Sequence, residues 1–354
     1  MRRSWKFAAT ATLVVLLGAK VPEAAQSAPP PAAIPAFDGS LSVLTYNVKG
    51  LPWPIALGRP AALTRIGDEL RSLHAQGKAP AVVVLQEAFT DHARAIGRSG
   101  GYRYVAGGPT EEEIASPLPS RDAESYAAGA RWWKGETEGK FVGSGLQVLS
   151  DYPIVAVKRM AFPAFACAGY DCLANKGALL VTLKIPGAPT PVEVLTTHLN
   201  SRHASGVEDA RSNVAYRLQV DALTAFVRRA HDPRYPLIAA GDYNVGSAPA
   251  RQADLLGAVR REWAGGSEVR DALGQFQRQG GRLGADAAWS RKRARDWQFY
   301  ADGTQGRLTL TGIDVPFGRD ARGDMLSDHV GYVARFGLVS ADGSGATSSA
   351  KPKG

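Results

Sequence analysis

The chain has 354 residues, of which 45% are hydrophobic, a formal net charge of +9 and two cysteines. This length allows one large domain or two ordinary ones, with enough apolar residues for a sizeable core. Two cysteines without neighbouring cysteine or histidine partners exclude a zinc site built on them. The positive charge favours anionic partners such as phosphodiesters, nucleic acid or acidic membrane surfaces.

The N-terminus has the pattern of an export signal. Basic residues precede an apolar run over 7–19, and small residues follow it. The run is shorter than the roughly 20 apolar residues of a membrane span, and an uncleaved anchoring N-terminus is the alternative. We therefore expect a signal peptide over 1–27, a linker rich in proline and alanine over 28–40, and a secreted or periplasmic protein.

Periodicity predicts a chain with many strands and few helices. Alternating or continuous apolar runs predict strands at 41–48, 81–85, 142–149, 153–160, 177–185, 191–199, 237–240, 307–317 and 329–338. Helical spacing predicts helices at 63–74, 206–230 and 250–263. Such a pattern favours two packed sheets with helices outside.

The remaining segments show no clear periodicity. We expect 107–140 to be a long surface excursion, while 264–306 is polar, glycine-rich and basic. The composition of 339–354 predicts a disordered tail. No interior boundary divides the rest, so 41–338 is expected to form one domain. We also expect the protein to be a monomer.

The two cysteines are close in sequence. Cys167 and Cys172 would close a small loop, and an exported protein folds in an oxidising compartment. A disulfide between them is therefore expected, with two buried free thiols as the alternative.

Six short polar signatures follow predicted strands in a fixed order. They bring carboxylates, amides and two histidines toward one place, an inventory that suits a divalent cation and an acid/base pair acting on a phosphate ester. The signatures are Tyr46-Asn47, Gln86-Glu87, Ser144-Gly145, Thr197-His198-Leu199-Asn200, Gly241-Asp242-Tyr243-Asn244 and Ser327-Asp328-His329.

This ordered set resembles the endonuclease/exonuclease/phosphatase superfamily, which includes pancreatic-type DNase and neutral sphingomyelinases. The resemblance covers about residues 41–338 and implies a DNase-like, four-layered α/β/β/α sandwich of two mainly antiparallel sheets with flanking helices. Within the superfamily the chain is most similar to the bacterial sphingomyelinase-like branch. Three segments carry that similarity: Gly50-Leu51-Pro52-Trp53, Asp151-Tyr152-Pro153-Ile154, and Asp171 to Gly177 with its Asn-Lys-Gly end.

The resemblance implies a metal-binding role for the first group of residues. Glu87 would be the main ligand of Mg²⁺, with Mn²⁺ or Co²⁺ as alternatives, and Asn47 would help to fix the metal or its water. Asp328 would serve a second metal or the water. Asp242 and Asn244 would orient the attacking water and bind the phosphoryl oxygens.

The resemblance also implies roles for the histidines and their neighbours. His329 would be the general base, oriented by Asp314. His198 would contact the phosphate and assist the leaving alkoxide. The side chains expected around the substrate phosphate are Asn200, Asn175 and Lys176.

The implied reaction is in-line attack of water on a phosphodiester. A phospholipase C-like activity on sphingomyelin is favoured, with a secreted DNase-like endonuclease as the alternative. An inositol-phosphate phosphatase and a non-catalytic binding module are more distant alternatives. A lipid substrate would require contact with a phospholipid membrane, for which Trp53 and Trp297 are candidates unless they pack in the core.

Overall fold

A computed structural model describes residues 34–113, 121–263 and 268–342. The predicted signal peptide over 1–27, the start of the predicted linker at 28–33 and most of the predicted tail, 343–354, lie outside these residues. Residues 339 and 340 of the predicted tail belong to a strand that ends at Ser340. Within the described parts, no helix has both the length and the apolar character needed to cross a bilayer.

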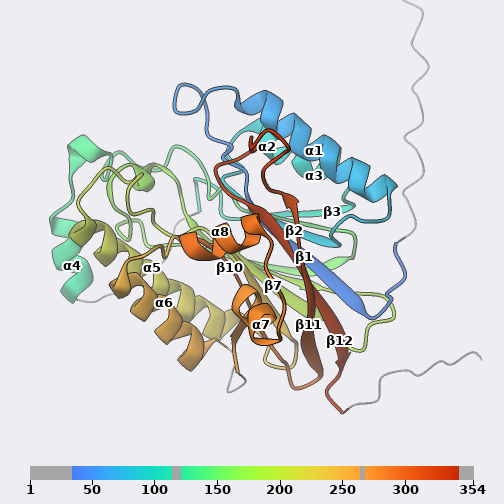
Figure 1. Cartoon of the computed structure of the whole chain (residues 1–354). Coiled ribbons are helices and arrows are strands. Elements are labelled where there is room, and N and C mark those ends of the chain that lie inside the picture. Colours follow the sequence, from blue (N-terminus) through green and yellow to red (C-terminus); the bar gives the residue numbers. More distant parts are fainter. Residues whose placement is uncertain (1–33, 114–120, 264–267, 343–354) are drawn as a thin grey trace, which may run out of the picture. The chain divides into compact units, whose positions relative to one another are not determined.

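Two six-stranded sheets form the centre of the fold (Figure 1). The first sheet has the order β11-β12-β1-β2-β4-β3. Its strands are β1 (Ser40–Asn47), β2 (Val82–Gln86), β3 (Tyr104–Gly107), β4 (Gln147–Ser150), β11 (Gly306–Phe317) and β12 (Gly331–Ser340). Only β1 and β2 pair in parallel; the other pairs of this sheet are antiparallel.

The second sheet has the order β5-β6-β7-β8-β10-β9, and again a single pair, β7 with β8, is parallel. Its strands are β5 (Ile154–Ala161), β6 (Gly177–Leu183), β7 (Val192–Thr197), β8 (Leu237–Asp242), β9 (Arg270–Asp271) and β10 (Asp296–Ala301).

Helices cover the outer face of each sheet (Figure 1). Helices α1 (Arg59–Ala75), α2 (Asp91–Arg94) and α3 (Ile96–Ser99) lie on the first sheet, and α5 (Asp209–Ala230) and α6 (Pro249–Glu262) lie on the second. The other helices are α4 (Arg121–Ala128), α7 (Ala272–Arg278), α8 (Ala285–Arg293) and the 3-10 turns η1 (Trp132–Lys134) and η2 (Gly169–Leu173).

Three layers of apolar side chains hold the sandwich together. Between the sheets, residues such as Val43 and Val84 pack against Leu179 and Val194, all fully buried. Outside this layer, Leu63 and its neighbours on α1 pack on the first sheet, and the apolar face of α5 packs on the second. The strands alternate between these layers because successive side chains point to opposite faces. The fold is therefore the four-layered α/β/β/α sandwich that the sequence predicts.

The predicted elements are mostly confirmed, but the prediction lacks the strand β3, the helices α2 and α3, and the elements of one longer segment. The segment 264–306, for which the sequence predicts no regular element, contains α7, α8 and the internal strand β10. Ala294 ends α8 with φ of 50°, and this left-handed turn reverses the chain directly into β10. The predicted surface excursion over 107–140 contains α4 and η1. Residues 114–120 of this segment lie outside the described part.

Candidate active site

Polar side chains from both sheets converge where β1, β2, β7 and β8 end. Asn47 is the last residue of β1, Glu87 follows β2, His198 follows β7 and Asp242 is the last residue of β8. Both sheets place their single parallel pair here, so four strands deliver their C-terminal residues to one edge. Five of the six sequence signatures meet there, while Ser144-Gly145 supports the loop that carries Glu87.

Asn47 connects the two carboxylates of the site. Its Nδ2 donates to Glu87 Oε1 at 2.8 Å and to Asp242 Oδ2 at 3.0 Å, which ties the first sheet to the second. Its Oδ1 accepts from the Lys49 backbone N–H at 3.0 Å. The Asn47 nitrogen thus holds the two carboxylates together, while the Asn47 oxygen faces the backbone of Lys49 and points away from the space between the carboxylates.

Glu87 has the features of a cation ligand. Its Oε2 is buried and accepts no hydrogen bond from any described residue. Burial raises the pKa of this carboxyl above its ordinary value, against the opposing effects of Asn47 and His329. Its backbone has φ of 57°, an unusual conformation for a residue with a Cβ. The backbone N–H of Ala88, the residue after Glu87, donates to Gly145 O at 2.8 Å.

Glu87, His198 and Asp242 each present a ligand atom within 4.8 Å of the others, and so do Asp242, Asp296 and His329. A divalent cation fits the first group, since two carboxylates would take its charge and an otherwise unpartnered Oε2 would gain a partner. Asp328 is not in either group. Its half-exposed carboxylate lies 3.5 Å from Lys49 Nζ, so the predicted metal-binding role of Asp328 is not supported by its position.

His329 is held by a carboxylate that the sequence prediction missed. Its Nδ1 lies 2.9 Å from both oxygens of Asp296, and its Nε2 lies 3.8 Å from Asp242 Oδ2. Burial lowers the pKa of His329, but Asp296 and Asp242 outweigh that effect and raise it to about 9. Ser327 Oγ donates to Asn47 O at 2.7 Å and fixes the loop that carries this histidine.

The prediction that Asp314 orients His329 is wrong. Asp314 lies on the exposed part of β11 and pairs with Arg335 at 2.5 Å. Asp296 takes that place because it begins β10, the neighbour of β8 in the second sheet. The alternating apolar residues of 297–301 were the available signal for a strand, and a carboxylate at its start was the signal for a site residue.

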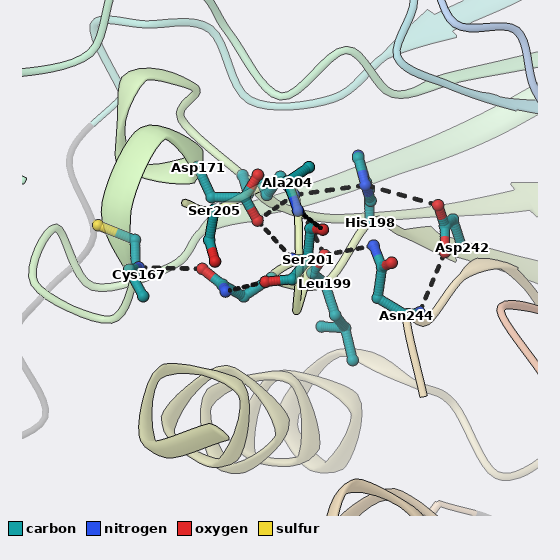
Figure 2. A network of polar contacts seen from close by, with 12 residues as sticks. Cys167, Asp171, His198, Leu199, Ser201, Ala204, Ser205, Asp242 and Asn244 are labelled. Carbon is teal, nitrogen blue, oxygen red and sulfur yellow. Dashed lines mark hydrogen bonds and ion pairs between the residues drawn. The ribbon is translucent and has the colours of Figure 1, made fainter. Parts of the chain in front are cut away.

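His198 also lies beside Asp242 (Figure 2). Its Nε2 is 3.6 Å from Asp242 Oδ2, 4.0 Å from Glu87 Oε1 and 3.3 Å from Lys176 Nζ. Burial and the Lys176 ammonium lower the pKa of His198 to about 4, so this imidazole is neutral at neutral pH. Asp242 itself, although buried, has its pKa lowered to about 2 by the two histidines.

Lys176 is nearly buried and lies within the site, as predicted from the Asn-Lys-Gly segment. Its Nζ donates to Asp171 Oδ2 at 2.9 Å and to Leu199 O at 3.1 Å. Asp171 lies between Cys167 and Cys172, which form the predicted disulfide with an S–S distance of 2.08 Å. The small closed loop therefore carries the anion that fixes Lys176.

Two other predicted residues support the backbone instead of facing a substrate. Asn175 donates its Nδ2 to Thr110 O and Glu113 O. Asn200 is fully buried, accepts from the Ala168 N–H through Oδ1 and donates to Ser201 O. The predicted phosphate contacts of Asn175 and Asn200 are therefore not supported by their positions.

Asn244 follows Asp242 and stays beside it (Figure 2). Its backbone N–H donates to Asp242 Oδ1, and its Nδ2 donates to Leu199 O, both at 3.0 Å. Its φ of 47° is a left-handed conformation, which asparagine tolerates better than most residues. This turn holds the Asp242 carboxylate toward the two histidines.

The two tryptophans proposed for membrane contact differ. Trp53 is 79% exposed on the loop that follows β1. Trp297 is partly buried, stacks on Phe299 with ring centroids 5.3 Å apart and donates its Nε1 to Ala294 O. Trp297 therefore packs on the outer core of the second sheet, whereas Trp53 remains available for contact.

Residues 44–329 match the model of the endonuclease/exonuclease/phosphatase family, and the chain belongs to that family. Its members are phosphoesterases and nucleases, which agrees with the carboxylates and histidines of the site. No curated protein sequence matches the chain significantly.

Solved structures share the fold at low sequence identity. Beta toxin from Staphylococcus aureus is 17% identical, with a TM-score of 0.54, and the match covers 83% of this chain and 99% of that one. Sphingomyelinase C from Streptomyces griseocarneus is 20% identical, with a TM-score of 0.54, and the match covers 84% and 99%. A humanized TDP2 from D. rerio is 14% identical, with a TM-score of 0.53, and the match covers 84% and 99%. These similarities establish the fold and leave the substrate open.

Proposed function

We propose that this protein is an exported, Mg²⁺-dependent phosphodiester hydrolase of the phospholipase C type that releases a phosphorylated headgroup from sphingomyelin or a related lipid. The observation that carries the hydrolase assignment is the buried group of Glu87, Asp242 and two histidines, with Glu87 Oε2 lacking a hydrogen-bond partner. Such a group could hold a cation, position a water and transfer protons in one place.

The two histidines support hydrolysis because their pKa values are moved in opposite directions. A site that needs an acid and a base is recognised by such a pair. Mg²⁺ bound at Glu87 would neutralise charge on the phosphoryl group, and its positive charge would lower the pKa of His329 from about 9 toward neutrality. A pKa near the working pH suits the role of a general base.

His329 and Asp242 then have complementary tasks. With Asp296 fixing Nδ1, Nε2 of His329 faces Asp242 and can take a proton from a water held there. The Lys176 ammonium donates to Nε2 of the neutral His198, and we assign to this pair the stabilisation of the leaving oxygen. Both histidines lie within 4 Å of Asp242 Oδ2, so each could reach a phosphoryl group bound there.

The exposed loop after β1 supports a membrane substrate. Trp53, Ile55 and Leu57 are 79%, 68% and 76% exposed, and Trp53 is six residues beyond Asn47 of the site. Tryptophan and aliphatic side chains are favoured at a bilayer interface. The loop therefore offers apolar contact beside the place where a headgroup would be cleaved.

A nuclease is the second candidate function, and a specific observation favours it. Basic residues over 291–295 precede Asp296 of the site, and cationic side chains beside a phosphodiesterase centre suit a polyanionic strand. The match to TDP2, of which one structure contains a single-strand DNA product, agrees with that alternative.

The test is Mg²⁺-dependent hydrolysis by the protein of sphingomyelin vesicles and of DNA, each with and without EDTA. Release of phosphocholine alone supports the phospholipase C activity, and cleavage of DNA alone replaces it with the nuclease. Trp53→Ala should weaken vesicle sedimentation severalfold, whereas Val339→Ala, an exposed apolar residue far from the site on β12, should not. Equal vesicle binding by both variants would remove the loop from the proposal.

A further inference from the structure

The side chain of Arg59 closes the base of the exposed loop between β1 and α1. Arg59 is the first residue of α1, directly after this loop. Its Nε donates to Lys49 O, and its Nη2 donates to Val48 O and to Leu326 O, each at 2.8 Å. All three acceptors are backbone carbonyl groups. The guanidinium therefore joins the two ends of the loop to each other and to a distant segment of the chain.

The base of the loop contacts the three segments that carry Asn47, Glu87 and His329. The carbonyl groups bound by Arg59 lie directly after Asn47 and directly before the Ser-Asp-His signature that ends in His329. The Gly50 N–H donates to Glu87 O at 2.9 Å. A Cβ at position 50 would lie only 2.4 Å from that oxygen, so the close approach requires glycine.

The tip of the same loop is apolar and exposed. Trp53, Ile55 and Leu57 are at this tip, where two backbone N–H groups donate to Pro52 O and fold the chain into a turn. A bilayer that takes up the tip would restrict the motion of the chain down to its base. Because Arg59 fastens that base to the site, a second ligand bound there would meet a segment that is already ordered, and its binding would cost less.

We propose that Arg59 is a positioning residue that couples membrane contact of the loop to cation binding at Glu87. This inference rests on the proposed function, because it concerns the membrane contact and the cation site named there. Arginine suits the role since its planar guanidinium presents several donors in a fixed arrangement, which the ammonium of a lysine does not. Coupling between two binding sites is reciprocal, so Mg²⁺ should tighten membrane binding by the factor by which the membrane tightens Mg²⁺ binding.

The experiment measures sedimentation of the protein with vesicles of digalactosyldiacylglycerol, in Mg²⁺ and in EDTA. This lipid contains no phosphate and no charge, so it is not a substrate and Mg²⁺ does not bridge it to the protein. Mg²⁺ should tighten vesicle binding by the wild type about fivefold, the lower end of the range for coupled sites. Calorimetry with the same vesicles should show Mg²⁺ binding tightened by the same factor.

Two arginine variants separate this coupling from a merely structural role. Arg59→Lys should still bind vesicles through the apolar tip, but Mg²⁺ should change its vesicle binding by less than about twofold. Arg71→Lys is the matched control, because Arg71 lies on the same helix and donates to Ser99 O outside the site. It should retain the full effect of Mg²⁺.

A second variant tests the contact between the loop base and Glu87. Gly50→Ala places a Cβ against Glu87 O and should also reduce the effect of Mg²⁺ on vesicle binding. Circular dichroism shows whether each variant remains folded, and the effect of Mg²⁺ on the wild type tests the coupling without any variant.

The possible results distinguish this inference from the proposed function. No vesicle binding by the wild type, no effect of Mg²⁺ on that binding, or the same effect in Arg59→Lys as in Arg71→Lys overturns the coupling, even if sphingomyelin is hydrolysed. An effect of Mg²⁺ that the wild type shows and Arg59→Lys loses supports the coupling, even if the protein proves not to hydrolyse sphingomyelin.

Discussion

His198 and His329 are both buried, and both lie within 4 Å of Asp242 Oδ2, yet their environments act in opposite directions. The charged group nearest to His198 is the Lys176 ammonium, and the charged group nearest to His329 is the Asp296 carboxylate. The pKa of His198 is lowered to about 4, while that of His329 is raised to about 9. Burial is common to both, so the neighbouring charge decides which imidazole carries a proton.

The largest expected effect comes from removing the histidine on the Asp296 side. His329→Ala should lower kcat by about 10²–10⁴-fold, the contribution typical of a positioned acid or base. Asp296→Asn should reproduce much of this loss, whereas Asp314→Asn should leave kcat within about twofold of wild type. A large loss in Asp314→Asn, with normal activity in Asp296→Asn, would restore the orienting role predicted from the sequence.

Loss of the proposed cation ligand should remove both Mg²⁺ binding and activity. Glu87→Gln should abolish Mg²⁺ binding measured by calorimetry and lower kcat by about 10²–10³-fold, the scale of a lost electrostatic contact in a transition state. Removing Mg²⁺ from the wild type with EDTA should have the same result. Undiminished Mg²⁺ affinity in Glu87→Gln would place the cation elsewhere.

Removing the neighbouring charges should move the pKa values of the two histidines toward each other. Lys176→Met should raise the pKa of His198, and Asp296→Asn should lower the pKa of His329, as followed by NMR titration of the imidazole protons. Each variant should leave the other histidine less affected. If both imidazoles respond equally to either change, the neighbouring charge does not decide their protonation.

Removing the disulfide between Cys167 and Cys172 should show how far the environment of His198 depends on the loop that this disulfide closes. Cys167→Ser with Cys172→Ser should lower the free energy of unfolding by about 2 kcal/mol, because a short loop is no longer closed in the unfolded chain. The His198 resonance should shift, since Asp171 lies in that loop, and the His329 resonance should not. Urea unfolding and the same NMR titration measure both effects.

A third histidine, outside the site, gives the smallest effect. Burial lowers the pKa of His74, but its hydrogen bond to Asp151 outweighs burial and raises it above 6.5. Protonated His74 therefore stabilises the fold below the unfolded pKa, and this stabilisation disappears as the pH rises through the folded pKa.

His74→Asn should accordingly destabilise the protein more at pH 5 than at pH 8.5, by about 0.5 kcal/mol for a half-buried ion pair. His92→Asn, an exposed histidine on α2, is the control and should show no such pH dependence. A larger loss at pH 8.5 than at pH 5 would contradict the sign derived for His74.

The sequence by itself determined the fold class and most of the site. Period-2 strands, a few amphipathic helices and polar signatures at strand ends were sufficient, because these features are local in the chain. Asn47, Glu87, His198 and Asp242 lie together in the structure because each directly ends or follows a strongly apolar strand, and strand ends of one sheet meet at one edge.

The tertiary structure decided the partners of those residues. Asp296 orients His329 because β10 pairs with β8, a long-range pairing that no local pattern encodes, while Asp314 pairs with Arg335 across β11 and β12. Asn200 and Asn175 look like ligands in the sequence, but their amides are used by neighbouring backbone groups. Long-range pairing of strands and competition for hydrogen bonds depend on the whole fold, and they determined which polar side chains meet in the candidate site.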